Sequence, residues 1–301
     1  MASNLATAAS DTEVIQGPWP GSTSGNPNLP GGRVLLRLGT SYGRTVVKDL
    51  YQAQPLRLLF PRPAPAEIFQ AALVCVSGGL VGGDRLHTDI AIEPDARAMI
   101  VGQAAEKVYR SLGPDCLVSN RLEVGARGWL EYLPQETIVF DSARLRRKTA
   151  AIVGPEAIFI GGDILVFGRA ARNERLTKGL IHDNWEIRDG FGRLLWKDAL
   201  HLDGDLAQIL SAAVTFDGAT AYATIIAVGL PRELCLNARV MAGSISSTTL
   251  RVFAAVLRGC LVFRFVGRST LELRKGFGQI WCGLRSLAGD LPPRLPALWS
   301  Q

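Results

Sequence analysis

Leu86-His87-Thr88-Asp89-Ile90-Ala91-Ile92-Glu93 is the stretch that decides the fold, because its polar and apolar residues follow a period of two. This period places the side chains at even-numbered positions on one face of a β-strand. His87 and Asp89 share the opposite, wetter face. The stretch therefore predicts a half-buried strand with one side turned to a core.

Short runs rich in β-branched and aromatic residues recur along the chain, separated by many of its 32 glycines. This spacing is typical of strands joined by turns. Two segments, 231–241 and 270–287, have helical features instead, a proline in the first turn and helically spaced apolar residues respectively. The predicted strands are 33–38, 45–51, 73–77, 87–93, 98–102, 129–133, 157–160, 164–168, 185–188 and 194–198.

The beginning of the chain has a different composition from the rest. Residues 1–32 contain no long apolar run and end in a tract rich in Gly, Pro, Ser and Asn, which predicts a disordered N-terminal tail. Neither a repeat of fixed period nor a linker divides residues 33–301. We therefore expect one mainly β domain with a few helices, including a C-terminal helix.

The overall composition limits the class of protein. Hydrophobic residues make up 48% of the chain and charged residues only 20%, below the roughly 25% of ordinary domains, which indicates surface normally covered by partners. The five cysteines are scattered and odd in number, which favours free thiols in a reducing compartment, the cytoplasm. The chain lacks an apolar run of eighteen residues, so we expect no membrane span.

The charge balance is only modestly basic. Lysine and arginine number 33 against 27 acidic residues, a net charge of +6. Basic clusters at 144–148 and 169–178 lack interleaved aromatic residues, which nucleic-acid sites use for stacking. A solvated face or a protein interface is the better interpretation, and no nucleic-acid partner is expected.

Common catalytic patterns are weakly represented. Gly39-Thr40-Ser41-Tyr42-Gly43 matches the nucleophile elbow, in which Ser41 would serve a hydrolase, but that motif needs a helix where a second strand is predicted. The glycine-rich run 78–84 lacks the Lys-Ser/Thr ending of a phosphate-binding loop. The three histidines lie far apart and no CxxC pair exists, so a tight metal site is poorly supported.

Three blocks, taken in order, carry a resemblance to a known family. The sequence is similar to the urease accessory D (also called H) family in Gly78-Gly79-Leu80-Val81-Gly82-Gly83-Asp84, in Gln103-Ala104-Ala105-Glu106-Lys107-Val108-Tyr109-Arg110-Ser111 and in Trp129-Leu130-Glu131-Tyr132-Leu133-Pro134-Gln135-Glu136-Thr137-Ile138-Val139-Phe140. The likeness extends over about residues 33 to 299. One departure is Glu106, where the family usually has Thr or Ser.

The resemblance implies a β-rich, partly β-helical or sandwich-like fold and a role rather than a reaction. Members of this family bind a second accessory protein, the F component, and through it a GTPase, the G component, and the assembly docks on apo-urease. Transient Ni²⁺ released by the GTPase passes through a water-filled route toward the urease active site. This chain is accordingly expected to be a non-catalytic scaffold and nickel conduit, with no tightly bound cofactor.

A conduit must hold its cargo weakly, and carboxylates with water suit a hydrated divalent ion. Asp84, Asp163 and Asp198 stand in or beside apolar segments, where a carboxylate needs a partner, water or metal, and they are the passage candidates. Equally open is that each caps a turn or pairs with an arginine such as Arg85 or Arg169.

The remaining candidates concern interfaces. Glu106, Lys107, Tyr109 and Glu136 lie in the family blocks and are candidates for shaping the passage or anchoring the F component, or for ordinary strand packing. Phe277, Trp281 and Trp299 are candidate docking anchors, or core residues of the C-terminal helix. Two alternative functions stay open: a serine hydrolase using Ser41, and a stand-alone nickel-binding protein.

Overall fold

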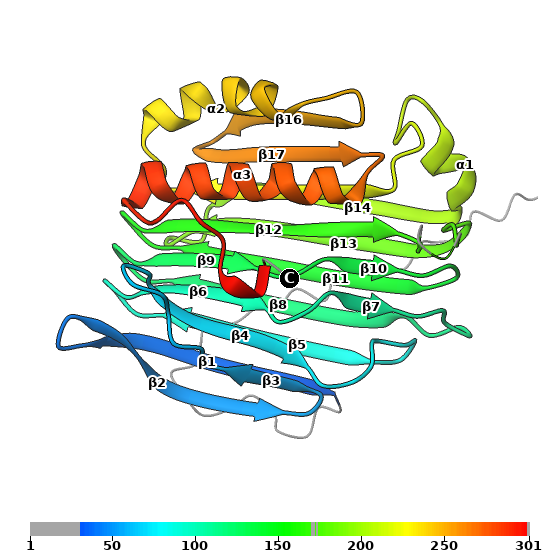
Figure 1. The fold of residues 1–301 in the computed structure, drawn as a ribbon. Helices are drawn as coiled ribbons and strands as arrows, with labels where there is room; N and C mark the ends of the chain where they lie inside the picture. The colour runs from blue at the N-terminus through cyan, green and yellow to red at the C-terminus, as the bar shows by residue number, and fades with distance from the viewer. Residues whose placement is uncertain (1–30, 170–171, 173, 300–301) are drawn as a thin grey trace, which may run out of the picture. The chain divides into compact units, whose positions relative to one another are not determined.

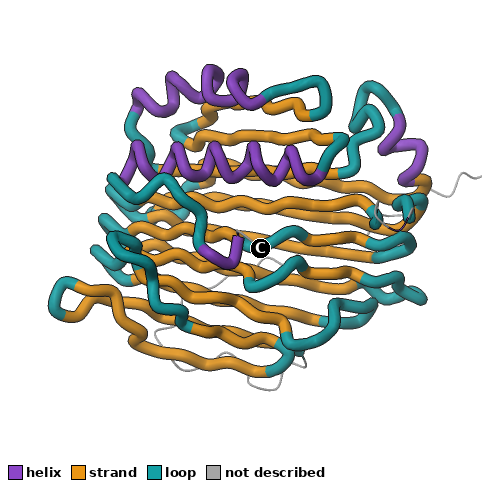
Figure 2. The backbone as a smooth tube through the Cα atoms, viewed as in Figure 1, coloured by secondary structure: helices purple, strands orange, loops and turns teal. Residues whose placement is uncertain are grey.

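The computed structural model describes residues 31–299, apart from 170, 171 and 173. The predicted N-terminal tail lies outside this range except for Gly31 and Gly32, and the first strand begins at Gly32. The described chain forms two large β-sheets with helices on one side (Figures 1 and 2).

The first sheet, sheet A, has seven strands. Its neighbours from β13 to β1 are all parallel, while the edge strands β14 and β2 pair antiparallel. In spatial order the strands are β14 (Leu194–Asp205), β13 (Lys178–Asp189), β11 (Arg144–Val153), β8 (Cys116–Val124), β5 (Arg85–Ile92), β1 (Gly32–Ser41) and β2 (Arg44–Ala53).

The second sheet, sheet B, has ten strands. Two of these are short: β10 (Thr137–Val139) pairs with β12, and β7 (Glu106–Val108) pairs with β10. The others, in spatial order, are β16 (Leu250–Leu257), β17 (Cys260–Gly267), β15 (Ala221–Val228), β12 (Ile158–Phe167), β9 (Trp129–Leu133), β6 (Arg97–Gly102), β4 (Phe69–Cys75) and β3 (Leu56–Leu59).

From β4 to β13 the chain passes back and forth between the two sheets, and each pass stacks in parallel on the one before. This is a solenoid-like arrangement, so the expected β-rich, partly β-helical fold is confirmed. The two sheets enclose a core of apolar side chains that includes Leu36, Ile90, Leu122 and Phe159. Leu86, Thr88, Ile90 and Ile92 are buried as the alternation predicts, but Asp89, predicted on the wetter face, is buried as well and pairs with His87 at 2.6 Å.

Three helices lie among the described residues: α1 (Leu206–Ser211), α2 (Arg232–Ile245) and α3 (Thr270–Gly289). Figure 1 shows α2 and α3 on the same side of the molecule as the outer face of sheet B. They form a second core with that face, and Phe277 and Trp281 are fully buried in it. The chain then continues to a 3-10 helix, Ala297–Trp299, which packs Trp299 against Phe277.

The structure differs from one strand prediction and contradicts one functional alternative. The strands predicted at 157–160 and 164–168 are one strand, β12, which continues through Gly161-Gly162-Asp163. Ser41 ends β1 and the chain turns directly into β2, so the helix that a nucleophile elbow requires is replaced by a strand. This local structure contradicts the hydrolase alternative.

Candidate functional site

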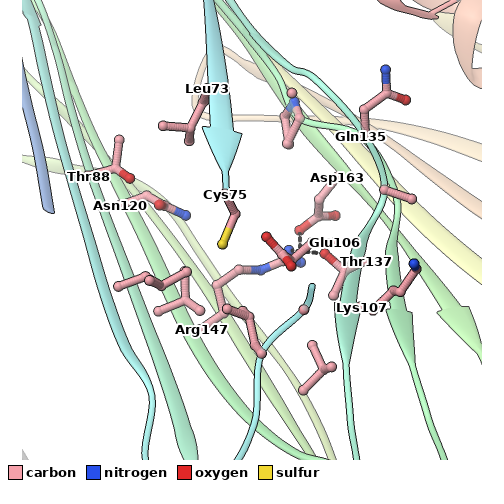
Figure 3. Close-up of a pocket in the computed structure, with 18 of the residues that line it drawn as sticks. Leu73, Cys75, Thr88, Glu106, Lys107, Asn120, Gln135, Thr137, Arg147 and Asp163 are labelled. Atoms are coloured by element: carbon pink, nitrogen blue, oxygen red, sulfur yellow. Dashed lines mark hydrogen bonds and ion pairs between the residues drawn. The ribbon is translucent and has the colours of Figure 1, made fainter. Parts of the chain in front are cut away.

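A cavity of about 320 Å³ lies between the two sheets. Its wall combines inward side chains of β5, β8, β11 and β13 with residues of β4, β7, β9 and β12. The volume is far above the roughly 10–15 Å³ that a single water requires. Figure 3 shows that its labelled lining residues include polar and charged side chains, so the interior of the solenoid is not uniformly apolar here.

A row of polar side chains crosses the cavity wall at one level of sheet A. Thr88, Asn120, Thr149 and Trp185 are successive register neighbours on β5, β8, β11 and β13. The Asn120 side-chain amide donates a hydrogen bond to the Thr149 hydroxyl at 3.1 Å. Hydroxyl and amide groups stacked in an interior need hydrogen-bond partners, which water in the cavity can supply.

Two residues before Thr149 on β11, Arg147 carries a buried positive charge between two carboxylates. Its Nη2 donates to Asp163 at 2.7 Å and to Asp183 at 2.5 Å, and its Nη1 donates to the Thr137 hydroxyl at 3.0 Å. The Trp185 indole N–H donates to the same Asp163 oxygen at 2.9 Å. All three charged side chains are at most 8% exposed. The cluster ties β11 and β13 of sheet A to β12 of sheet B.

The charges in this cluster do not cancel. Burial raises the pKa of Asp163, and the neighbouring Asp183 carboxylate raises it further, against the lowering effect of Arg147. Burial alone would lower the pKa of Arg147, but the two carboxylates raise it, so Arg147 stays charged. Two carboxylates therefore share one cation, and Asp163 holds a proton more readily than an exposed carboxylate does.

Glu106 lies at another part of the cavity wall, where the chain leaves the regular strand structure of sheet B. Strand β6 ends at Gly102 and β7 begins at Glu106, so residues 103–105 form a break between them. Burial raises the pKa of Glu106 to about 7, although the Cys75 thiol and Lys107 favour its charged form, and Asp84 adds to the increase. Near neutral pH this carboxyl group can readily exchange a proton for a cation.

The structure brings some predicted site residues together and separates others. Asp163, Glu106 and Lys107 line the same cavity. Asp84 instead accepts a hydrogen bond from the Val81 N–H at 2.8 Å and caps its own turn. Asp198 forms an ion pair with Arg264 across the two sheets. Asp163 pairs with an arginine, but this is Arg147 rather than Arg85 or Arg169, the two examples that the sequence suggested.

The interface candidates have structural contacts. The Tyr109 hydroxyl donates to the Gly78 carbonyl at 2.9 Å, and its ring packs edge-on against Phe140. Glu136 pairs with Arg274 of α3. Phe277, Trp281 and Trp299 are at most 4% exposed, so in this structure they are core residues rather than surface anchors.

Sequence reasoning missed Arg147, which it placed in a solvated basic cluster. The strand period was the available indication: Leu145, Arg147 and Thr149 alternate inward while Arg146 and Lys148 point outward. Cys75 and Asn120 were missed too. Within the described residues no three His, Cys, Asp or Glu side chains come together as metal ligands.

Comparison with known proteins agrees with the three sequence blocks. The profile of the UreD urease accessory protein family matches residues 31–300. A urease accessory protein UreD of Magnetococcus marinus is 38% identical over 271 residues, 89% of this chain and 93% of that protein. UreD 1 of Methylobacterium radiotolerans is also 38% identical, over 89% of this chain and 91% of its own length. The chain therefore belongs to the UreD family of urease accessory proteins.

Proposed function

We propose that this protein is a urease maturation factor that gives Ni²⁺ a weakly binding interior route and catalyses no reaction of its own. The observation that carries the proposal is the polar cavity inside the solenoid, where Glu106, Asn120 and Thr149 face a common space. Oxygen ligands of this kind hold a hydrated divalent ion without the commitment of imidazole or thiolate clusters.

The charges along the cavity suggest where the cargo is held. Arg147 and Trp185 both donate hydrogen bonds to the Asp163 carboxylate. A cation that approached this carboxylate would therefore meet the fixed positive charge of Arg147. Glu106 has no arginine partner among its interactions in the structure and can release its proton near pH 7. We therefore assign the first contact with Ni²⁺ to Glu106, and to Asp163 the role of holding Arg147 in place.

A polar route beyond the cavity is built into sheet B. Asp163, Thr224 and Arg264 are register neighbours on β12, β15 and β17, and Arg264 pairs with Asp198 of β14. Asp198 thus belongs to the continuation of the polar row, in which its charge is balanced by arginine. This placement supports a passage in which water, rather than a chain of free carboxylates, surrounds the ion.

The proposed partners are the F component, the GTPase G component bound through it, and apo-urease, with GTP hydrolysis assigned to the GTPase. The name of the family links it to urease. The five free thiols fit assembly in a reducing compartment, the cytoplasm. None of the helices in the described part of the chain has the length and apolarity needed to cross a membrane.

Dehydrating the cavity wall is expected to impair urease activation. Asn120→Leu keeps the number and branching of the side-chain heavy atoms but removes the amide that faces the cavity. Nickel-dependent urease activity, measured after co-expression with the F and G components and apo-urease, should fall about five- to tenfold, because hydrated Ni²⁺ loses a polar wall.

The matched control is Ser119→Leu, which places the same side chain one residue earlier, on the outward-facing side of β8. Both variants must still co-purify with the accessory proteins. Full activity with Asn120→Leu would argue against an interior route, and full activity without this chain would remove the proposed role altogether.

A pH-dependent interaction with nickel is expected at Glu106. Weak Ni²⁺ binding by the isolated protein, followed by equilibrium dialysis, should increase as the pH rises through about 7, where the Glu106 carboxyl loses its proton. Glu106→Gln should abolish this increase. The pKa of Glu106 in the folded state lies above the ordinary glutamate pKa of 4.5, which applies in the unfolded chain. The folded state therefore binds more protons, and the stability of the wild type relative to Glu106→Gln should decrease as the pH rises from about 4.5 to 7.

Tight, stoichiometric nickel binding in the same dialysis would favour the stand-alone nickel-binding protein over a conduit. A pH profile that Glu106→Gln leaves unchanged would assign the binding to another group.

A further inference from the structure

Along their main strand order, sheets A and B end in four edge strands, and three of these carry features that discourage pairing with another chain. Strand β2 has charged residues along it and a register shift against β1. Strand β3 is only four residues long. Strand β14 carries several charged side chains and a register shift against β13. The fourth edge, β16, is eight residues long, pairs in a regular register and carries one charged residue, Arg251.

Strand β16 is an open, regular and apolar edge. Over Leu250–Leu257 it pairs with β17 without a register shift, and after Arg251 its remaining residues are Val, Phe, Ala, Ala, Val and Leu. Phe253 is 58% exposed and Leu257 52% exposed. Large apolar side chains on a long, unshielded edge strand mark an interaction site rather than a solvated end.

The backbone of β16 is also available. Arg258 and Gly259 both have positive φ and form a two-residue turn, so Leu257 and Cys260 close the hairpin as a hydrogen-bonded pair. Alternation then turns the N–H and C=O groups of Ala254 and Val256 toward the open edge. Nearer the start of the strand, the N–H of Val252 is instead held by the Ser246 hydroxyl at 3.2 Å.

The exposed side of β16 has a clear structural origin. Its Val252 side faces α2 and is buried in the second core. The opposite side, with Phe253, Ala255 and Leu257, continues the inner face of sheet B. Sheet A ends at β14, whereas sheet B continues through β15, β17 and β16. The inner face of the last strand is therefore left without a covering layer, at the end of the stack where Figure 1 shows β16.

We propose that β16 binds an extended segment of another protein, which adds to sheet B as a further strand and has an apolar centre with acidic ends. The apolar centre matches Phe253, Ala255 and Leu257. The acidic ends match Arg251, the second residue of the strand, and Arg258, which directly follows the strand. Arg251 and Arg268 share the single carboxylate of Asp217, so positive charge is in excess there.

Charge argues against a second copy of this chain as the occupant. A two-fold antiparallel pairing centred on Ala254 would set Arg251 of one copy opposite Leu257 of the other, one residue away from Arg258. Like charges across neighbouring strands are destabilising. An acidic segment gains from the same two arginines, which selects a different partner. This surface is separate from the cavity, and its occupancy does not depend on nickel transfer.

The test uses the full-length protein and a fluorescein-labelled peptide of alternating valine and threonine with glutamates at both ends. Fluorescence anisotropy should show binding that weakens with added salt and is at least about tenfold tighter than for the same peptide ending in lysines. Val256→Pro removes an edge-facing N–H that β17 does not use and should weaken binding at least about tenfold. Val256→Thr is the matched control and should retain binding.

A second variant guards against misfolding of the proline variant. Arg258→Glu leaves the backbone intact and should reverse the preference between the glutamate and lysine peptides. Equal affinity for both peptides, or unchanged binding by Val256→Pro and Arg258→Glu, would overturn the proposal. A dimer in sedimentation velocity that is lost in Val256→Pro would also overturn it, because the occupant would then be a second copy.

Discussion

Methionine in place of Arg147 is expected to lower the free energy of unfolding by about 3–5 kcal/mol, measured by urea denaturation. The guanidinium donates to Asp163 and Asp183, and both carboxylates are at most 5% exposed. Without it, two buried carboxylates face each other, and both must bind protons or water. The loss should therefore be greatest above pH 7 and shrink in acid, where the variant's carboxylates are protonated.

The triple variant Arg147→Met, Asp163→Asn, Asp183→Asn provides the control. Neutral amides keep the size of the carboxylates and can still hydrogen-bond to Thr137 and to each other, so most of the lost stability should return. A loss below about 1 kcal/mol for Arg147→Met alone would mean that water already screens the cluster. In that case the cavity reaches further into the solenoid than its lining residues indicate.

Alternation predicted strands with one buried face, such as 33–38, which lies within β1. Residues 129–133 were predicted as well and form β9 although all five are buried, because their aromatic residues directly follow a glycine. Strand β15 was missed because all eight of its residues, Ala221–Val228, are buried between the solenoid core and the helices. A strand covered on both faces has no alternation to detect. The C-terminal helix was predicted at 270–287 and is α3, because helical spacing survives where only one face is buried.

The site was predictable only in part, since the stacking of coils decides which side chains meet. Asp163 was found as a carboxylate within an apolar run, and it does line the cavity. Glu106 reaches the same cavity from a strand far away in sequence, and no local pattern fixes that proximity. For Asp84 the local sequence allowed two interpretations, because a carboxylate after a glycine-rich run fits either a passage or a turn. In the structure Asp84 caps the turn by accepting the Val81 N–H.

A stacked solenoid is a suitable scaffold for an interior polar route. Each turn of the solenoid contributes one residue at the same height, so Thr88, Asn120 and Thr149 form a row with one residue from each turn. The next inward-facing residues on the same strands, Ile90 and Leu122, are apolar and retain the packing that keeps the sheets together. Polarity is thereby confined to a narrow track, and its removal at one coil should interrupt transfer without unfolding the domain.

The second large stability effect is expected at Arg285, which fixes α3 and the chain after it. Its side chain is fully buried, and it donates to Glu131, to Glu67 at 2.7 Å, and to the carbonyl oxygens of Pro292 and Arg294. Arg285→Met leaves two buried carboxylates and two carbonyl groups without this donor. The free energy of unfolding in urea should fall by about 3–5 kcal/mol.

Arg294→Met is the matched control for Arg285→Met, because Arg294 also contacts Glu67, at 3.2 Å, but its side chain is 49% exposed. Glu67 keeps its ion pair with the buried Arg285 when the half-exposed Arg294 is replaced, so this variant should lose less than about 1 kcal/mol. The indole N–H groups of Trp129 and Trp281 both donate to Glu131, so tryptophan fluorescence should change in Arg285→Met and not in the control. Equal losses in the two variants would show that Glu67, rather than the buried guanidinium, holds the C-terminal segment on sheet B.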